Sequence, residues 1–262
     1  MMRVVSLCPS NTEVVGYLGK EEMLIAVDDY SDWPEMVKPL PRIGPDLAID
    51  MDKVEAMKPD LVLASLSVPG MERNIEELEK RKLPHIILDP QSFNDIADNI
   101  KTVGKALGFE TLGREKAESF LKEIEKYRML SKKIRERPSL YWEWWPKPIF
   151  TPGGINWLSE LSRLAGGYNI FETEDKANVQ TDWEEVRSRN PDHICMVWVG
   201  VKTAKMNRAH ITNRPHAHEL TAVKTNNIHL LEENFFCRPS PRLLKGLEKL
   251  TSILHNTSSN VF

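Results

Sequence analysis

The sequence lacks the features that mark a membrane-spanning protein or a nucleic-acid binder. No apolar run in its 262 residues approaches the ~20 residues that a transmembrane helix requires. Lys and Arg number 35 against 38 Asp and Glu, and no basic block indicates nucleic acid. The chain is therefore expected neither to cross a membrane nor to bind DNA or RNA.

Cysteine is scarce, and an export signal is not visible. The three cysteines, Cys8, Cys195 and Cys237, are widely scattered, which fits free thiols in a reducing compartment. No basic segment followed by an apolar stretch opens the chain. As the sequence stands it predicts a cytoplasmic protein; the alternative is an exported or lipid-anchored protein whose signal is not part of this sequence.

Catalytic motifs are missing as well. No nucleophile and base stand in a recognisable arrangement, and no phosphate-binding loop is present, so we expect no enzyme and no cofactor. A metal-dependent enzyme is the alternative, because His210, His216 and His218 cluster. His216 and His218 fall on a short predicted helix, where side chains two residues apart diverge, so no metal site is assigned.

The most informative stretch that is present is a long helix, Leu112 to Arg137, which lies near the middle of the chain. It contains no proline, and Pro138 follows it. Its apolar residues recur at three- and four-residue steps and form one stripe: Ala117, Phe120, Leu121, Ile124, Tyr127, Leu130 and Ile134. The helix is interpreted as a rigid strut about 35 Å long; an ordinary surface helix of a single domain is the alternative.

Strand and helix patterns alternate on both sides of this helix. Short β-rich runs such as Leu61 to Ser65 and His193 to Val199 are each separated from the next by amphipathic segments. The predicted fold class is α/β, with two parallel-sheet lobes joined by one long rigid helix. The predicted domains are an N-terminal lobe (residues 1–110), the connecting helix (111–137) and a C-terminal lobe (138–262), with a ligand cleft between the lobes.

One segment occurs twice, which indicates related lobes. Residues 52–60 end in Pro-Asp before a strand, and so do residues 184–192. Aligning the two Pro-Asp pairs places Asp52 on Glu184, each in the first turn of a short helix. Acids at helix starts are common because they stabilise the helix dipole, but a matching pair suggests one carboxylate presented at an equivalent place by each lobe.

Several motifs together resemble a known family, the iron/cobalamin class of ABC-transporter substrate-binding proteins. The resemblance covers nearly the whole chain, from Arg3 to Leu254. It is carried by the order and spacing of Ser6-Leu7-Cys8-Pro9-Ser10-Asn11-Thr12-Glu13, Tyr30-Ser31-Asp32-Trp33-Pro34, Met51 to Leu63, Phe150 to Gly153, and Arg238-Pro239-Ser240-Pro241-Arg242. It implies the class III substrate-binding-protein fold, two α/β lobes joined by one long helix with little opening and closing. It also implies a corrinoid ligand, cobalamin or cobinamide.

The resemblance also implies a site. The ligand would meet the Tyr30 loop on one lobe, and Phe150 with the Asn234–Arg238 loop on the other. A flat macrocycle needs aromatic faces on both sides, and its amide rim needs a few polar donors. The ligand-binding residues expected are Tyr30, Trp33, Trp144, Trp145, Phe150, Asn234, Phe235, Phe236 and Arg238. For Tyr30 and Trp33, packing at the edge of the core is the alternative, and for Arg238 it is an ion pair within its lobe.

The four residues Trp142-Glu143-Trp144-Trp145 put a tryptophan on each face of a strand. One of these faces therefore packs in the core, and the family match puts Trp144 and Trp145 near the mouth of the cleft. Trp198, at the end of an apolar strand, is expected in the core.

The family also implies a protein partner. Asp52 and Glu184 are expected to dock a monomeric binding protein on basic residues of the two subunits of an ABC permease, although the family's usual first-lobe acid is glutamate. A soluble ligand carrier is the alternative if no permease partner exists. A haem or ferric-siderophore binder on the same scaffold is the other alternative, but the aromatic-rich and basic-poor residue set favours a near-neutral corrinoid.

Overall fold

The structure, a computed structural model, describes residues 1–255 and divides into two compact units. The first unit contains residues 1–121 together with Pro239–Pro241, and the second contains residues 122–238 and the chain from Arg242 on. The division therefore falls inside the long helix, not at residues 110 and 138, and a three-residue segment near the end of the chain belongs to the first unit. Among the described helices, none is both long and apolar enough to cross a membrane.

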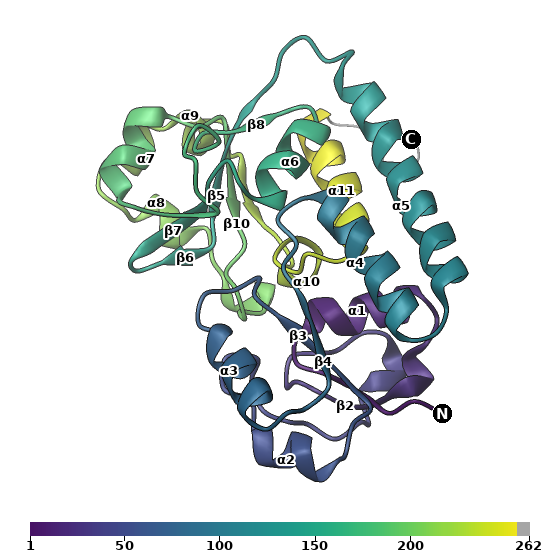
Figure 1. Ribbon diagram of the computed structural model, residues 1–262. Coiled ribbons are helices and arrows are strands. Elements are labelled where there is room, and N and C mark those ends of the chain that lie inside the picture. Colours follow the sequence, from purple (N-terminus) through teal and green to yellow (C-terminus); the bar gives the residue numbers. More distant parts are fainter. Residues whose placement is uncertain (256–262) are drawn as a thin grey trace. The chain divides into compact units, whose positions relative to one another are not determined.

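The first unit is built on a four-stranded parallel sheet in the order β2-β1-β3-β4. Its strands are β1 (Val4–Ser6), β2 (Leu24–Val27), β3 (Leu61–Ser65) and β4 (His85–Leu88). Strand β3 is buried along its whole length, as expected for a strand covered on both faces. Figure 1 shows α1 (Pro9–Tyr17) and α4 (Phe93–Ala106) on one face, with α2 (Met51–Ala56) and α3 (Glu72–Lys80) on the other.

Helices α4 and α1 of this unit have different N-terminal caps. Helix α4 begins with a capping box, in which the hydroxyl of Ser92 accepts from the Asp95 backbone N–H and the Asp95 carboxylate accepts from the Ser92 N–H. Ser10 and Glu13 have the spacing of a capping box, but Ser10 lies inside α1 and not at its N-cap, so they do not form one. Helix α1 starts at Pro9, which takes the first helical position, and Glu13 instead accepts a hydrogen bond from Ser240.

The second unit has its own four-stranded parallel sheet in the order β11-β10-β5-β8. Its strands are β5 (Ser139–Glu143), β8 (Tyr168–Asn169), β10 (His193–Met196) and β11 (Ile228–Leu230). Figure 1 shows α6 (Trp157–Leu164) and α11 (Leu243–His255) together on one face, and α7 (Trp183–Arg189), α8 (Ala209–Thr212) and α9 (Thr221–Lys224) beyond the other.

The second unit also contains a smaller antiparallel sheet, of which two strands lie between β5 and α6 in the chain and the third lies between β8 and α7. It consists of β6 (Trp145–Pro146), β7 (Ile149–Pro152) and β9 (Asn178–Thr181), in the order β6-β7-β9. The remaining short elements are α10 (Glu233–Phe236) and the 3₁₀ turns Glu21–Met23, Glu35–Val37, Thr203–Lys205 and Ala217–Glu219. The short predicted helix that includes His216 and His218 is not continuous, because Leu220 is extended (φ −66°, ψ 140°) between the turn Ala217–Glu219 and α9.

Helix α5 (Glu110–Ser131) is the long helix that the sequence predicts, and it crosses the division between the units. Its inward residues Ala117, Phe120 and Ile124 are fully buried. It ends at Ser131, six residues before the predicted end at Arg137. The Ser131 carbonyl accepts there from the Ile134 backbone N–H at 3.2 Å and from the Arg137 guanidinium at 3.3 Å.

The sequence repeat has a structural counterpart. Helices α2 and α7 are both capped by an aspartate, Asp50 and Asp182, whose side chain accepts from the backbone N–H three residues on. After each helix the chain passes a left-handed residue, Lys58 (φ 46°) or Asn190 (φ 40°), and then the Pro-Asp pair. The aspartates of these pairs are Asp60 and Asp192. The carboxylate of Asp60 accepts from the backbone N–H of Arg3 at 2.7 Å, and that of Asp192 accepts from the backbone N–H of Ser139 at 2.8 Å.

Candidate functional site

Tyr30 stands on a rigid loop of the first unit. The loop follows β2, where parallel strands present their carboxyl ends and such folds bind ligands. The buried Asp28 accepts from the Tyr30 backbone N–H (2.8 Å) and from the Ser31 hydroxyl. The Arg42 guanidinium donates to the carbonyls of Asp28 and Ser31 at 2.8 and 2.6 Å. The Tyr30 side chain is left 47% exposed on this fixed backbone, so its ring is available to a ligand.

Trp33 lies on the same loop but is half-buried. A Cβ atom added at Gly16 of α1 would lie 2.9 Å from the Trp33 ring and 2.6 Å from Cδ of Pro34. Trp33 and Pro34 therefore pack directly on the backbone of α1, which explains why a glycine stands there. This contact gives Trp33 a packing role, and its part in ligand binding stays a prediction.

In the second unit, Trp145 and Phe150 form an aromatic pair. They are directly opposite each other in the antiparallel register of β6 and β7, so their side chains share one face. Trp145 is 44% exposed and its indole N–H donates to the carbonyl of Lys147 at 3.1 Å, while Phe150 is half-buried. The pair places two aromatic side chains next to each other on one face of the small sheet, an arrangement suited to contact with a planar ligand.

Trp144 points the other way, into the second unit. It is 9% exposed, and its ring lies 5.5 Å from that of Trp157. Trp142, on β5, is fully buried and donates to the hydroxyl of Ser162 at 2.9 Å. The side chains of Trp142 and Trp144 therefore pack in the core, as expected for one face of the strand, and Trp145 is the exposed member of the three.

The expected binding loop, Asn234–Arg238, offers less surface than its sequence suggests. Phe236 has no exposed area and packs on Trp142 at 5.6 Å, so its ring has no face free for a ligand in this structure. Arg238 is buried and pairs with Glu233 at 3.0 Å. Phe235 is half-buried beneath Arg242, and Asn234 is half-buried at the surface. The charge of Arg238 is thus compensated within its own unit.

The two acids of the repeat are both at the surface. The Asp52 side chain is 86% exposed and the Glu184 side chain 78%. Each carboxylate contacts an arginine: Asp52 contacts Arg81 at 2.7 Å, and Glu184 contacts Arg187 at 2.5 Å. Exposed pairs of this kind contribute about 0–1 kcal/mol, so both acids are available to another partner.

The histidine cluster does not assemble. His216 contacts Glu219 at 3.0 Å, and the ring of His210 packs on Trp198 at 4.8 Å. Within residues 1–255, no group of three or more His, Cys, Asp or Glu side chains is arranged to hold a metal ion. Burial raises the pKa of the Cys8 thiol to about 12 and also raises the pKa values of Cys195 and Cys237, so none is a ready nucleophile.

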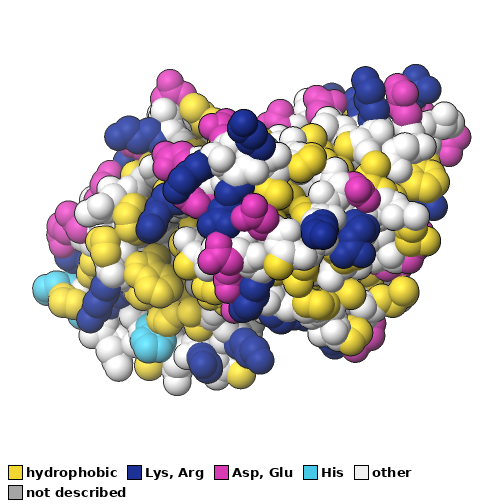
Figure 2. Space-filling view, turned by 60° about the horizontal axis from the view of Figure 1, so that its bottom comes forward, with side chains coloured by type: hydrophobic (Ala, Val, Ile, Leu, Met, Phe, Trp, Pro, Cys, Tyr) yellow, Lys and Arg dark blue, Asp and Glu magenta, His cyan; other side chains and the backbone are white. Residues whose placement is uncertain are grey.

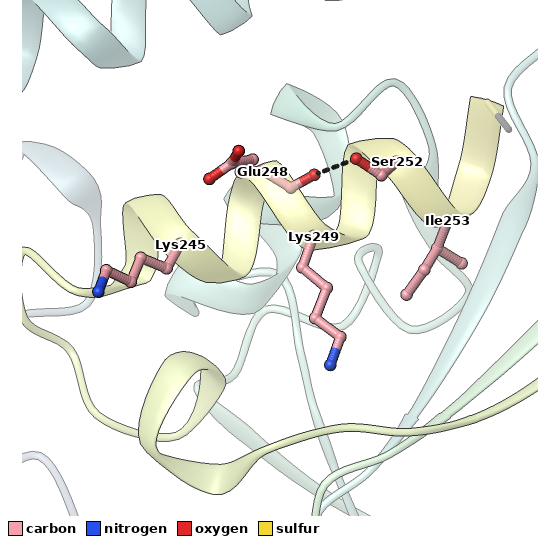
Figure 3. Close-up of a pocket in the computed structure, with 5 residues that line it drawn as sticks. All are labelled: Lys245, Glu248, Lys249, Ser252 and Ile253. Atoms are coloured by element: carbon pink, nitrogen blue, oxygen red, sulfur yellow. Dashed lines mark hydrogen bonds between the residues drawn. The ribbon is translucent and has the colours of Figure 1, made fainter. Parts of the chain in front are cut away.

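Two further surface features of the described residues, the face drawn in Figure 2 and a depression beside α11, do not suggest another site. On the face drawn in Figure 2, dark blue and magenta side chains are interspersed, so no extended area of one sign appears there. A depression beside α11, shown in Figure 3, is lined by residues of that one helix: Lys245, Glu248, Lys249, Ser252 and Ile253. It contains no aromatic ring and none of the expected site residues.

With this geometry in hand, the comparison with known proteins is decisive for the family. The family model described as periplasmic binding protein matches residues 4–234, and the chain belongs to this family. Members of the family are substrate-binding proteins of transport systems, not enzymes.

Individual relatives are similar over nearly the whole chain. The vitamin B12-binding protein of Vibrio cholerae serotype O1 is 29% identical over 255 residues, covering 96% of this chain and 88% of the relative. An uncharacterized ABC transporter substrate-binding lipoprotein of Bacillus subtilis, YvrC, is 30% identical over 97% of this chain and 80% of its own length.

Solved structures agree in fold. The periplasmic vitamin B12 binding protein BtuF of Vibrio cholerae has a TM-score of 0.81 at 26% identity, covering 96% of both chains. The periplasmic heme-binding protein RhuT of Roseiflexus sp. RS-1 has a TM-score of 0.85 at 21% identity, covering 97% of this chain and 98% of its own. The predicted fold class, two parallel-sheet α/β units with the class III binding-protein fold, is confirmed.

Proposed function

We propose that this protein is the substrate-binding component of an ABC importer and that its ligand is a corrinoid, cobalamin or cobinamide. The observation that carries the proposal is the pair of fixed, exposed aromatic surfaces, Tyr30 on the first unit and Trp145 with Phe150 on the second. Likeness to vitamin B12-binding proteins supports the same ligand. The names of the family and of the lipoprotein relative support a protein that works outside the cytoplasm.

The charge of these surfaces favours a corrinoid over haem or a ferric siderophore. Haem carries propionates and many siderophores are anionic, so both call for unpaired cations. Arg238, the cation of the expected binding loop, is already paired with Glu233. A corrin ring offers a flat face to the aromatic rings and neutral amides at its edge, which matches the aromatic side chains Tyr30, Trp145 and Phe150.

Titration with cobalamin, cobinamide, haem and a ferric siderophore tests the ligand. We expect one corrinoid per chain, detected by absorbance and by quenching of tryptophan fluorescence. Tyr30→Ala and Trp145→Ala should each weaken corrinoid binding by about 1–2 kcal/mol, because each removes a stacked face. Tyr168→Ala is a matched control, since Tyr168 is 40% exposed and is not among the expected site residues. Failure of both corrinoids to bind at millimolar concentration would refute the proposal. If haem binds more tightly than either corrinoid, the proposed ligand is wrong and haem takes its place.

We further propose that Asp52 and Glu184 dock the protein on its permease. Two exposed carboxylates at equivalent places of a repeat suit a partner with two related subunits. The double variant Asp52→Lys/Glu184→Lys should keep its ligand affinity, should change the free energy of unfolding by no more than about 0.5 kcal/mol per site, and should lose capture by detergent-solubilised permease. The control Glu118→Lys/Asp175→Lys reverses the same charge at two other exposed acids and should be captured normally. Equal capture of both double variants would contradict the docking role.

A further inference from the structure

The small antiparallel sheet of the second unit places three side chains in one row. Trp145 on β6 is opposite Phe150 on β7, and Phe150 is opposite Gln180 on β9. Residues opposite each other on antiparallel strands share a face and have Cβ atoms about 5 Å apart. We call these three residues the cross-strand row.

Burial shows which face of the sheet carries the row. Thr151 and Val179, which alternate with the row along β7 and β9, are buried, and so is Ile149. Trp145 and Gln180 are exposed and Phe150 is half-buried between them. The sheet therefore turns one face into the core of its unit and the cross-strand row outward.

Gln180 differs from its neighbours because its side chain is uncommitted. The hydroxyl of the next residue, Thr181, donates to Glu185 at 2.7 Å, and the indole of Trp145 is fixed by the carbonyl of Lys147. Within the described part of the chain, the Gln180 carboxamide makes no side-chain hydrogen bond. It can both donate and accept, beside two aromatic faces and without a charge in the row.

We propose that Gln180 determines specificity by hydrogen-bonding a carboxamide at the edge of a planar ligand whose face stacks on Trp145 and Phe150. This inference rests on the proposed function and adds to it a residue that selects neutral, amide-edged ligands. A carboxamide pairs with glutamine through a donor and an acceptor at once. A carboxylate meets only one compatible group there and finds no cation in the row to offset its desolvation.

The test measures cobalamin and haem affinities for the full chain and three variants by tryptophan quenching. Gln180→Ala should weaken cobalamin binding about 5- to 10-fold, the loss expected for one good hydrogen-bonding group. Gln180→Arg should weaken cobalamin and strengthen haem, so that the ratio of the two dissociation constants shifts by at least about 10-fold towards haem. Asn213→Ala, which removes another exposed amide of the same unit, should leave both affinities unchanged.

The outcomes separate this inference from the function on which it rests. If the unaltered protein binds cobalamin and Gln180→Ala binds it within twofold as tightly, Gln180 is no specificity residue while the proposed function stands. An unchanged ratio in Gln180→Arg overturns the inference in the same way. If the unaltered protein binds no corrinoid, both the function and the inference are wrong.

Discussion

Arg214→Met should lower the free energy of unfolding by about 3–5 kcal/mol, because it leaves a buried carboxylate without its counter-ion. Glu143, the last residue of β5, has no exposed surface. Arg214 donates to its two carboxylate oxygens at 2.6 and 3.0 Å. The hydroxyl of Tyr141 and the indole of Trp198 donate to the same group at 3.0 and 3.1 Å. These two neutral donors remain in the variant but cannot balance a full charge.

The design of the measurement separates charge from packing. Urea unfolding of Arg214→Met is compared with the double variant Glu143→Gln/Arg214→Met, which removes both charges and should recover most of the lost stability. Arg163→Met is the control, because its pair with Glu172 is exposed and should contribute no more than about 1 kcal/mol. A double variant no more stable than Arg214→Met would show that the loss comes from packing of the arginine over Trp183. If the single variant does not fold, the folded double variant still decides the point.

The cluster of Glu143, Arg214, Tyr141 and Trp198 also positions part of the proposed binding surface. Glu143 immediately precedes Trp144 and Trp145, so the four hydrogen bonds that it accepts fix the point where β5 passes into the small sheet. Burial, and next the neighbouring carboxylate, raise the pKa of Tyr141 well above its usual range, so its hydroxyl stays a donor at any physiological pH. The strand that leads into the pair of Trp145 and Phe150 is therefore held by a buried polar cluster.

The parts of the fold that sequence predicts well are those with local causes. The runs of β3 and β10 are buried as their apolar sequences predict, and so are Ala117, Phe120 and Ile124 of the stripe on α5, while the other stripe residues are half-buried. The repeat around Asp52 and Glu184 is also local, since an aspartate cap, a left-handed residue and a Pro-Asp pair all lie within eleven residues. Each of these signals is contained in one short segment.

The parts that sequence misses depend on residues far apart in the chain. Phe235 and Phe236 are adjacent and chemically identical, and only packing on Trp142 decides that Phe236 is the buried one. The hydrogen bonds from Arg214 to Glu143 join residues 71 positions apart, and no local sequence pattern predicts them. The sequence alone does not point to Gln180, because its place beside Phe150 depends on strand register, which a four-residue strand without a hairpin turn does not specify.

Stability should fall as the pH drops from about 6.5 towards 4, and part of that fall should come from one pair of histidines. His193 on β10 and His229 on β11 stack with ring centroids 5.2 Å apart, and Nδ1 of the first lies 3.0 Å from Nε2 of the second. One ring must offer a lone pair for this hydrogen bond, so protonating both converts an attraction into a repulsion.

The surroundings of the pair set the direction of the effect. Burial first, then His193 and Arg208, lower the pKa of His229 to about 4. Burial also lowers the pKa of His193, which Asp192 partly opposes and His255 reinforces. Between pH 6.5 and 4 the unfolded chain therefore binds protons that the folded chain does not, so the stabilisation is complete above pH 6.5 and is lost below it. A shift of this size in His229 corresponds to about 3 kcal/mol, which solvent screening of the half-buried ring reduces to about 1–2 kcal/mol.

The measurement compares the unfolding free energy at pH 7.5 and 4.5 for the unaltered protein and for His229→Gln. Glutamine keeps a hydrogen-bonding group near His193 but does not titrate, so the loss between the two pH values should be smaller in this variant by about 1–2 kcal/mol. His218→Gln removes a histidine whose side chain is 82% exposed and should show the full loss. Equal pH dependence in all three proteins would mean that other groups, such as carboxylates with lowered pKa values in surface ion pairs, account for the acid sensitivity.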